Sequence, residues 1–197
     1  VRAIGMTAAQ RAALIGRIEA NPVIAAVRRE EDVDAAVASP VGTVFLLHAD
    51  IFSLPGLVER FRQAGKDTFV HVDFLEGIGR DAKAIQWLAK VVGPSGILTT
   101  KSQHVRTAQE NGLFVIQRFF LIDHQSFDLA VRTVRATGPD LVEVMPALMP
   151  GIITRFREAV GTPVIAGGLI ATKEEIVDIL KAGALGASTG NPALWDI

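Results

Sequence analysis

The sequence predicts an α/β fold, a short TIM-like (β/α) barrel, and two observations favour it. Eight β-rich runs recur roughly every 20 to 28 residues along the 197-residue chain. Most of these runs are separated by a segment whose apolar residues follow helical spacing. Such alternation is typical of a parallel sheet, and eight units can close as a barrel. A doubly wound open sheet is the alternative topology.

The predicted strands are short runs bounded by turn-forming residues. They are VIAAV at 23, TVFLL at 43, TFVHV at 68, GILTT at 96, LFVIQ at 113, LVEV at 141, PVIAG at 163 and GAST at 186. The fourth unit is the weakest, because only about a dozen residues separate GILTT from LFVIQ. That length leaves room for two or three helical turns.

Helix boundary signals support the same order of elements. Capping-box spacings occur at Thr7 with Gln10 and at Thr172 with Glu175. Pro150 is expected to open a helix, and Asn191 followed by Pro192 suits another helix start.

The chain is short for a barrel of this type, which typically has about 250 residues. It ends soon after the eighth strand, and an Ala-rich helix from Thr7 to Ala20, stopped by Asn21 and Pro22, precedes the first strand. We expect this N-terminal helix to replace the last outer helix. Residues 1–197 contain no linker or low-complexity tract and are predicted to form one barrel domain.

Composition excludes several classes of site. The chain has no cysteine, so disulfides, thiolate nucleophiles and thiolate metal sites are ruled out. Its net charge of −1 gives no general attraction to polyanions. We expect no membrane segment, a cytoplasmic location and no cofactor. The four histidines, at 48, 71, 104 and 124, are dispersed and predict no metal site, and His71 is expected to be a satisfied interior histidine.

Polar residues follow the predicted strands, at the sheet edge where ligands gather in such folds. Strand alternation predicts that Asp73 points into the barrel mouth, that Lys101 lies opposite Leu98, and that Glu143 lies opposite helix-facing valines. Two carboxylates and an ammonium would then converge. Structural roles are the alternative: Asp73 as a helix cap, Lys101 as a rim charge, and Glu143 as a partner of Arg118.

Two consecutive loops suit a phosphate group. Gly167 and Gly168 allow close backbone approach just before a helix that begins near Thr172. Ser188 and Thr189 offer hydroxyl donors before another helix start. Barrel enzymes commonly hold phosphate between the loops after strands seven and eight, which these loops would be. Tight turns with no ligand are the alternative.

These stretches together resemble the glycerol uptake operon antiterminator regulatory protein family. The resemblance runs from about Pro22 to Trp195 and rests on HVDFLEGIGRD, GILTTK, IQRFFLID, DLVEVMPALMP, VIAGGLIATKEE and STGNPALW. It implies a barrel that binds glycerol 3-phosphate and then stabilises a leader messenger RNA so that transcription continues past a terminator. It implies no catalytic turnover. The family commonly has arginine at the position of Lys101.

Carried over by matching position, the resemblance predicts an effector pocket of Asp73, Lys101, Arg118, Glu143, Gly167, Gly168, Ser188 and Thr189. Within it, we expect the two loops to hold phosphate with Lys101 or Arg28 nearby, and Asp73 or Glu143 to bind the glycerol hydroxyls. The role of His48 stays open, and so does homo-oligomerisation.

Leader RNA binding rests on the resemblance alone. A local footprint could come from helix arginines that otherwise form solvated faces: Arg132, Arg135, Arg155 and Arg157. An alternative function is a barrel enzyme acting on a small phosphorylated substrate, as an isomerase, aldolase or glycerol-phosphate transferase. Asp73 or Glu143 would then be the general base and Lys101 an electrophile or Schiff-base amine. A metabolite-binding barrel that signals to a protein partner is a third option.

Overall fold

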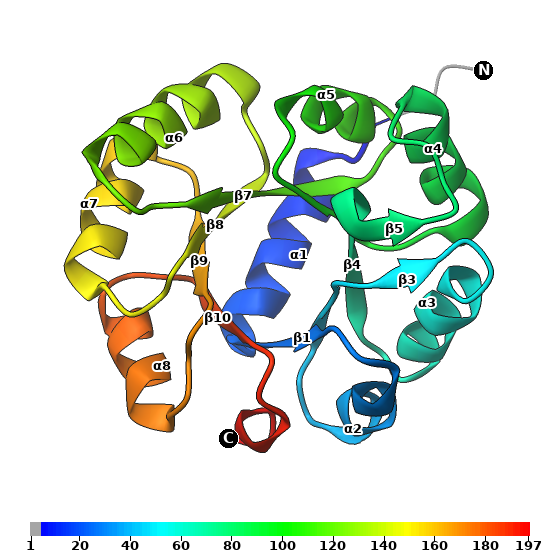
Figure 1. Ribbon diagram of the computed structural model, residues 1–197, viewed down its shortest axis with the longest axis horizontal. Coiled ribbons are helices and arrows are strands. Elements are labelled where there is room, and N and C mark those ends of the chain that lie inside the picture. The colour runs from blue at the N-terminus through cyan, green and yellow to red at the C-terminus, as the bar shows by residue number, and fades with distance from the viewer. Residues whose placement is uncertain (1–4) are drawn as a thin grey trace.

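The computed structural model describes residues 5–197 and shows a closed barrel of parallel strands inside a ring of helices (Figure 1). The strands, in order around the barrel, are β1 Val23–Val27, β2 Thr43–Leu46, β4 Asp67–His71, β6 Gly96–Thr99, β7 Phe114–Phe120, β8 Leu141–Met145, β9 Val164–Gly167 and β10 Gly186–Thr189. Pairing of Ile24 with Ser188 joins β1 to β10 and closes the barrel. The predicted fold and all eight predicted strands are confirmed.

The outer helices follow the strands in the expected alternation. They are α2 Val33–Ala38, α3 Leu54–Gln63, α4 Ala82–Trp87, α5 Ser102–Glu110, α6 His124–Thr137, α7 Pro150–Val160 and α8 Lys173–Lys181. Short helical turns complete them: η1 Glu30–Asp32, η2 Val72–Phe74, the π-helical η3 Leu88–Val92 and η4 Pro192–Leu194. The predicted caps are present, since the Thr172 side chain caps α8, Pro150 opens α7 and Asn191 caps η4.

The N-terminal helix α1, Ala8–Ala20, has the predicted Thr7 capping box but not the predicted place. Its buried residues Leu14 and Ile18 pack with the side chains inside the barrel. Arg17 bonds Asp67 at the start of β4, and Arg11 pairs with Asp140 just before β8. The helix therefore lies across the amino-terminal end of the barrel, and Figure 1 shows it crossing the centre of the ring.

The eighth outer position is filled by the C-terminal turn instead. Leu194 and Trp195 are buried in the layer between strands and helices. Trp195 Nε1 donates a hydrogen bond to the carbonyl oxygen of Thr189 at 2.9 Å, which ties the turn to the end of β10. In Figure 1 the turn lies between α8 and α2. The expectation that α1 replaces the last outer helix is thus corrected, because a 3₁₀ turn with one large aromatic covers that gap.

The barrel interior changes from apolar to polar along its axis. Near the amino-terminal end, Phe45, Phe69 and Phe114 pack edge to face with ring centroids 5.9 and 5.7 Å apart. Toward the carboxyl end of the barrel, the buried inner residues include His71 on β4, Arg118 on β7 and Glu143 on β8. Interior charge costs free energy unless it is paired, so this polar end marks the region in which to look for a site.

A small second sheet lies beyond the barrel strands. It pairs β3, Ala49–Asp50, with β5, Leu75–Glu76. Two-residue strands leave no alternation in the sequence, so no pattern predicts them. They bring the segments after β2 and β4 together at the carboxyl end of the barrel. None of the helices in the described part of the chain is both long enough and apolar enough to cross a membrane.

Candidate binding site

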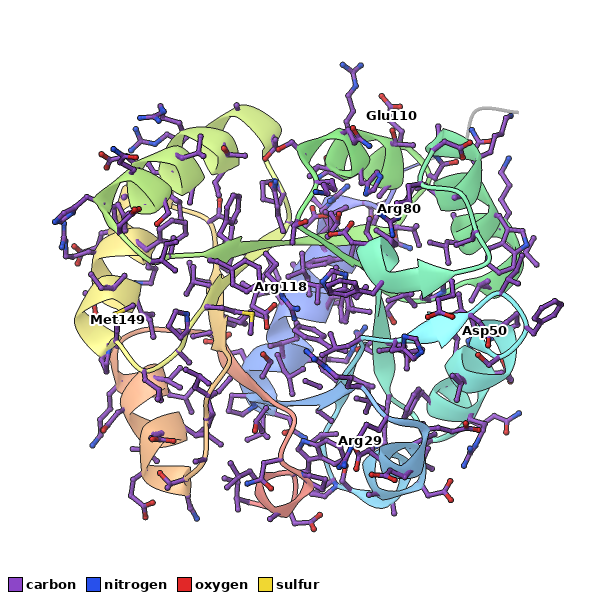
Figure 2. The ribbon with its side chains drawn as sticks, in the orientation of Figure 1. Arg29, Asp50, Arg80, Glu110, Arg118 and Met149 are labelled. Carbon is purple, nitrogen blue, oxygen red and sulfur yellow. The ribbon has the colours of Figure 1, made fainter. Side chains whose placement is uncertain are left out.

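A polar cavity of about 370 Å³ lies at the carboxyl end of the barrel. Its lining comes from β7 and the segments after β1, β2 and β4: Arg28, Leu47, His48, Phe74, Leu75, Glu76, Arg80 and Arg118. Figure 2 shows Arg118 over the centre of the barrel and Arg80 nearby, whereas Arg29 and Met149 lie out at the helix ring. The volume suits a small ligand, and the position is the one that barrel proteins use for binding.

Arg28 and Arg80, both exposed to solvent, bring two positive charges to this cavity, against the one carboxylate of Glu76 in the same lining. Within residues 5–197 neither guanidinium forms a hydrogen bond or an ion pair with the protein. By contrast, the adjacent Arg29 pairs with Asp32 and Glu31 on the outside. Free guanidinium groups facing one cavity favour an anion, above all a phosphate or carboxylate that can accept two hydrogen bonds.

Arg28 also lies beside the loop after β10. Ala25 of β1 pairs with Thr189 of β10, and Arg28 follows three residues later at the same end of the barrel. A Cβ placed on Gly190 would lie 3.5 Å from the carbonyl oxygen of Ala26. One anion could therefore contact both Arg28 and this loop.

Arg118, Glu143 and Ser188 form a buried network across three strands. Arg118 Nε donates to Glu143 Oε2 at 2.5 Å, and Ser188 Oγ donates to Glu143 Oε1 at 2.5 Å. Glu143 is fully buried and Arg118 is 5% exposed. Both carboxylate oxygens thus have partners inside the protein, as the structural alternative for Glu143 and Arg118 predicted.

The loop after β9 is close-packed at its first glycine. A Cβ at Gly167 would overlap Ser188 Oγ and lie 2.7 Å from Glu143 Oε1, so the close approach here is made by the protein's own side chains. Gly168 and Leu169 follow in left-handed conformations, with φ of 83° and 63°. Among residues 5–197, the amides of Leu169, Ile170 and Gly190 have no hydrogen-bond partner, which leaves donors at the rim.

Asp73 lies in η2, outside the cavity lining, and its carboxylate is bonded to the end of β6. Its Oδ1 accepts from the Thr99 hydroxyl at 2.8 Å, and its Oδ2 accepts from the Thr100 amide and hydroxyl, each at 2.7 Å. Burial acts to raise the pKa of this carboxyl, but the Thr100 and Thr99 hydrogen bonds and the nearby His71 outweigh it, and the pKa falls below its usual value.

His71 differs from the expected satisfied histidine. The side chain is 1% exposed and inside the barrel, yet neither ring nitrogen has a hydrogen-bond partner on another residue in the region that the structure describes. Burial, then Arg118 and Arg28, lower its pKa to about 4 against the opposing effects of Asp73 and of a hydrogen bond to the backbone of His71 itself. The imidazole is therefore neutral at pH 7.

Lys101 lies apart from these residues. Leu98 packs in the barrel interior and Ile97 packs against the helices, so Thr99 and Lys101 fall on the outer phase of the strand. Lys101 is exposed at the start of α5 and does not line the cavity. The prediction that its ammonium converges with the two carboxylates is therefore wrong, because Leu98, and not Thr99 or Lys101, is on the inner side of the strand.

The four helix arginines lie on two adjacent helices, Arg132 and Arg135 on α6 and Arg155 and Arg157 on α7 (Figure 1). Arg135 Nη2 donates to the carbonyl oxygen of Ala159 at 2.6 Å. The Arg155 guanidinium lies 5.3 Å from the ring centroid of Phe127. Arg157 lies against the turn after α8. Three of the four thus contact the protein while remaining exposed to solvent.

The sequence analysis did not select Arg80, Phe74 or Glu76 for the site, and left His48 open. All except His48 belong to one stretch, VDFLEGIGRD, which β5 folds back at the mouth. The signal that could have found Arg80 is its place just before Asp81, whose side chain caps α4. Residues before a helix cap at the carboxyl end of a parallel strand lie at the ligand edge.

A second cavity, of about 190 Å³, lies between α6 and α7. It is mainly apolar and is lined by Leu121, Ile122, Asp123, His124, Phe127, Met149, Ile152 and Arg155. No group of three potential metal ligands occurs among the described residues. The polar mouth is therefore the stronger candidate for a small charged ligand.

Comparisons with known proteins agree on one family. A family model described as glycerol-3-phosphate responsive antiterminator matches residues 23–195. The uncharacterized protein YgcP of Escherichia coli is 33% identical over 184 residues, which are 93% of this chain and 96% of YgcP. Both of these matches extend over nearly the whole barrel.

Two solved structures belong to the same group by name. The glycerol uptake operon antiterminator regulatory protein of Listeria monocytogenes has a TM-score of 0.85 and 28% identity, over 88% of this chain and 94% of that one. A glycerol uptake operon antiterminator-related protein of Thermotoga maritima has a TM-score of 0.78 and 33% identity. This match covers 89% of this chain and 98% of that one. A putative deoxyribose-phosphate aldolase of Coccidioides immitis, 12% identical over 94% of each chain with a TM-score of 0.69, shares the fold.

Proposed function

Because this chain belongs to the glycerol-3-phosphate responsive antiterminator family, we propose that its barrel mouth binds glycerol 3-phosphate and that the occupied protein acts on a leader messenger RNA. The family match and the two antiterminator structures confirm the predicted family and its regulatory class. The family match does not locate the ligand, so we propose its position from the residues of this chain.

The observation that carries the ligand proposal is the pair of guanidinium groups, Arg28 and Arg80, that lie on one polar cavity and have no ion-pair partner within residues 5–197. A dianionic phosphate supplies the missing counter-charge. Arg118 lines the same cavity but already has Glu143 as a partner. We place the phosphate between Arg28 and the end of β10, where Ser188 and Thr189 lie, with Arg80 on the other side of it. Gly168 and the amides after it would border the same position.

Glycerol 3-phosphate should raise the unfolding temperature of the wild-type protein more than glycerol or inorganic phosphate does, because ligands that bind the native state stabilise it. Replacing Arg28 with alanine should weaken binding by roughly 10-fold to 100-fold, since a charged hydrogen bond contributes about 1.5–3 kcal/mol. Thermal unfolding with each ligand measures both effects. Arg29→Ala is the matched control, because Arg29 pairs outside the cavity.

A wild-type protein that shows no shift specific to glycerol 3-phosphate would contradict the proposed function. Equal shifts in Arg28→Ala and Arg29→Ala would instead contradict only the role of Arg28. The two results are distinguishable, because the first is seen without any substitution.

For the leader RNA we propose the arginines of α6 and α7 as the contact surface. Removing Arg132, Arg135, Arg155 and Arg157 together should lower RNA affinity and make binding less dependent on salt, by roughly 0.7 in slope for each lost phosphate contact to a single strand. Filter binding with glycerol 3-phosphate at several salt concentrations measures this. Arg106→Ala on α5 is the control, and an unchanged slope in the fourfold variant excludes the surface.

Within this proposal the protein regulates without turning over its ligand, and acts in the cytoplasm, where leader RNA is transcribed. The aldolase alternative needs a desolvated lysine at the site to form a Schiff base. Lys101 is exposed and outside the cavity, and so does not support it. The similarity to the aldolase at 12% identity concerns the fold alone.

A further inference from the structure

His71 is a buried polar side chain whose ring nitrogens have no partner among the other residues that the structure describes. It ends β4, pairs in register with Leu98 and is 1% exposed. Buried polar groups in native proteins are nearly always hydrogen-bonded, and an unpaired one lowers stability. An apolar residue would fill the same space without that loss. A ligand that enters the barrel would supply the hydrogen-bond partner that this histidine lacks.

The position of His71 connects it to the mouth of the barrel. The Phe74 ring lies over the imidazole, with centroids 4.5 Å apart, and Phe74 lines the cavity while being 55% exposed. Arg118 both lines the cavity and acts electrostatically on His71. Phe74 is thus in contact with His71 on one side and borders the cavity on the other.

The two carboxylates assigned to this end of the barrel already have hydrogen-bond partners within the described residues. Both oxygens of Asp73 accept hydrogen bonds from Thr99 and Thr100, and both oxygens of Glu143 accept from Arg118 and Ser188. These carboxylates are the groups that sequence reasoning assigned to the glycerol hydroxyls. His71, by contrast, has no hydrogen-bond partner on another residue at either ring nitrogen within the described part of the chain.

We propose that His71 binds the hydroxyl-bearing end of glycerol 3-phosphate, with Phe74 moving aside, while the arginines hold the phosphate. A neutral imidazole offers one donor and one acceptor. A hydroxyl group likewise donates and accepts, whereas a phosphate dianion only accepts. His71 thereby distinguishes a phosphorylated polyol from a phosphate ester that lacks hydroxyls. This inference rests on the function proposed above.

The test compares two ligands of equal carbon chain, glycerol 3-phosphate and propyl phosphate, on wild-type, His71→Phe and His71→Gln proteins by calorimetric titration. His71→Phe keeps an aromatic ring and removes both polar atoms. It should weaken glycerol 3-phosphate binding about 10-fold or more, as expected for loss of one or two hydrogen bonds. Propyl phosphate binding should not change. His71→Gln keeps a donor and an acceptor and should recover part of the affinity for glycerol 3-phosphate. The glutamine variant also replaces the phenylalanine variant in the test if the latter does not fold.

The outcomes separate this inference from the proposal on which it rests. If wild-type protein does not bind glycerol 3-phosphate, both are overturned. If wild-type binds and the His71 variants bind glycerol 3-phosphate equally well, the role of His71 is overturned and the proposed function stands. Equal weakening of both ligands would assign His71 a merely structural role and overturn the inference as well.

Discussion

Replacing Arg118 with methionine is expected to lower the free energy of unfolding by about 3 to 5 kcal/mol, the usual cost of breaking a buried ion pair from one side. The substitution removes the guanidinium that bonds Glu143 Oε2 and leaves a fully buried carboxylate without its counter-charge. Methionine preserves much of the side-chain volume, so the loss would come from electrostatics more than from a cavity. Urea unfolding monitored by circular dichroism measures the effect.

The double variant Arg118→Met with Glu143→Gln provides the internal control. Glutamine removes the charge but retains an oxygen that can accept the hydrogen bond from Ser188. The double variant should therefore recover much of the stability that the single variant loses. Arg29→Met, which breaks a pair on the surface, should change stability little. If Arg118→Met proves as stable as Arg29→Met, the buried pair does not stabilise the barrel.

The wild-type protein should lose about 2 kcal/mol of stability relative to His71→Phe when the pH falls from 7 to 5. The folded-state pKa of His71 is lowered to about 4, mainly by burial and then by Arg118 and Arg28. The unfolded chain takes up a proton near pH 6.5, so between these values it binds more protons than the folded chain. The stability that the folded protein gains by keeping His71 neutral is therefore fully present above pH 6.5, and it is lost as the pH falls toward 4.

Urea unfolding of both proteins at pH 7, 6 and 5 measures this difference. Comparing variants cancels the titration of the other carboxyl groups and histidines. His124→Gln, which removes an exposed histidine at the start of α6, should keep the wild-type pH profile. Parallel profiles for wild-type and His71→Phe would mean that His71 becomes protonated without cost in the folded protein.

The local features of the fold could be predicted because their causes are local. Apolar runs and the spacing between them located all eight barrel strands. The capping boxes at Thr7 and Thr172 located two helix starts, since the bonds involved lie within four residues of each other. The motifs that follow the strands were also sufficient to identify the family.

The residues of the site were harder to predict, because they depend on which face of each strand is the inner one and on contacts between distant segments. Alternation says which residues of a strand share a face but not which face is the inner one, and in β6 both Ile97 and Leu98 are apolar. Lys101 was therefore placed on the wrong side. The two-residue strand β5 leaves no pattern, so Arg80 was not expected at the mouth.

By itself the sequence determined the strands, the helix caps, the barrel and the family, because periodicity and capping are properties of neighbouring residues. The packing of distant segments places α1 across the amino-terminal end of the barrel and gives both carboxylate oxygens of Glu143 a partner in Arg118 or Ser188. The same packing buries His71 where no other residue of the described chain bonds its ring nitrogens. These features depend on contacts between strands that are far apart in the sequence. Such contacts determine which buried polar groups are hydrogen-bonded and which are not.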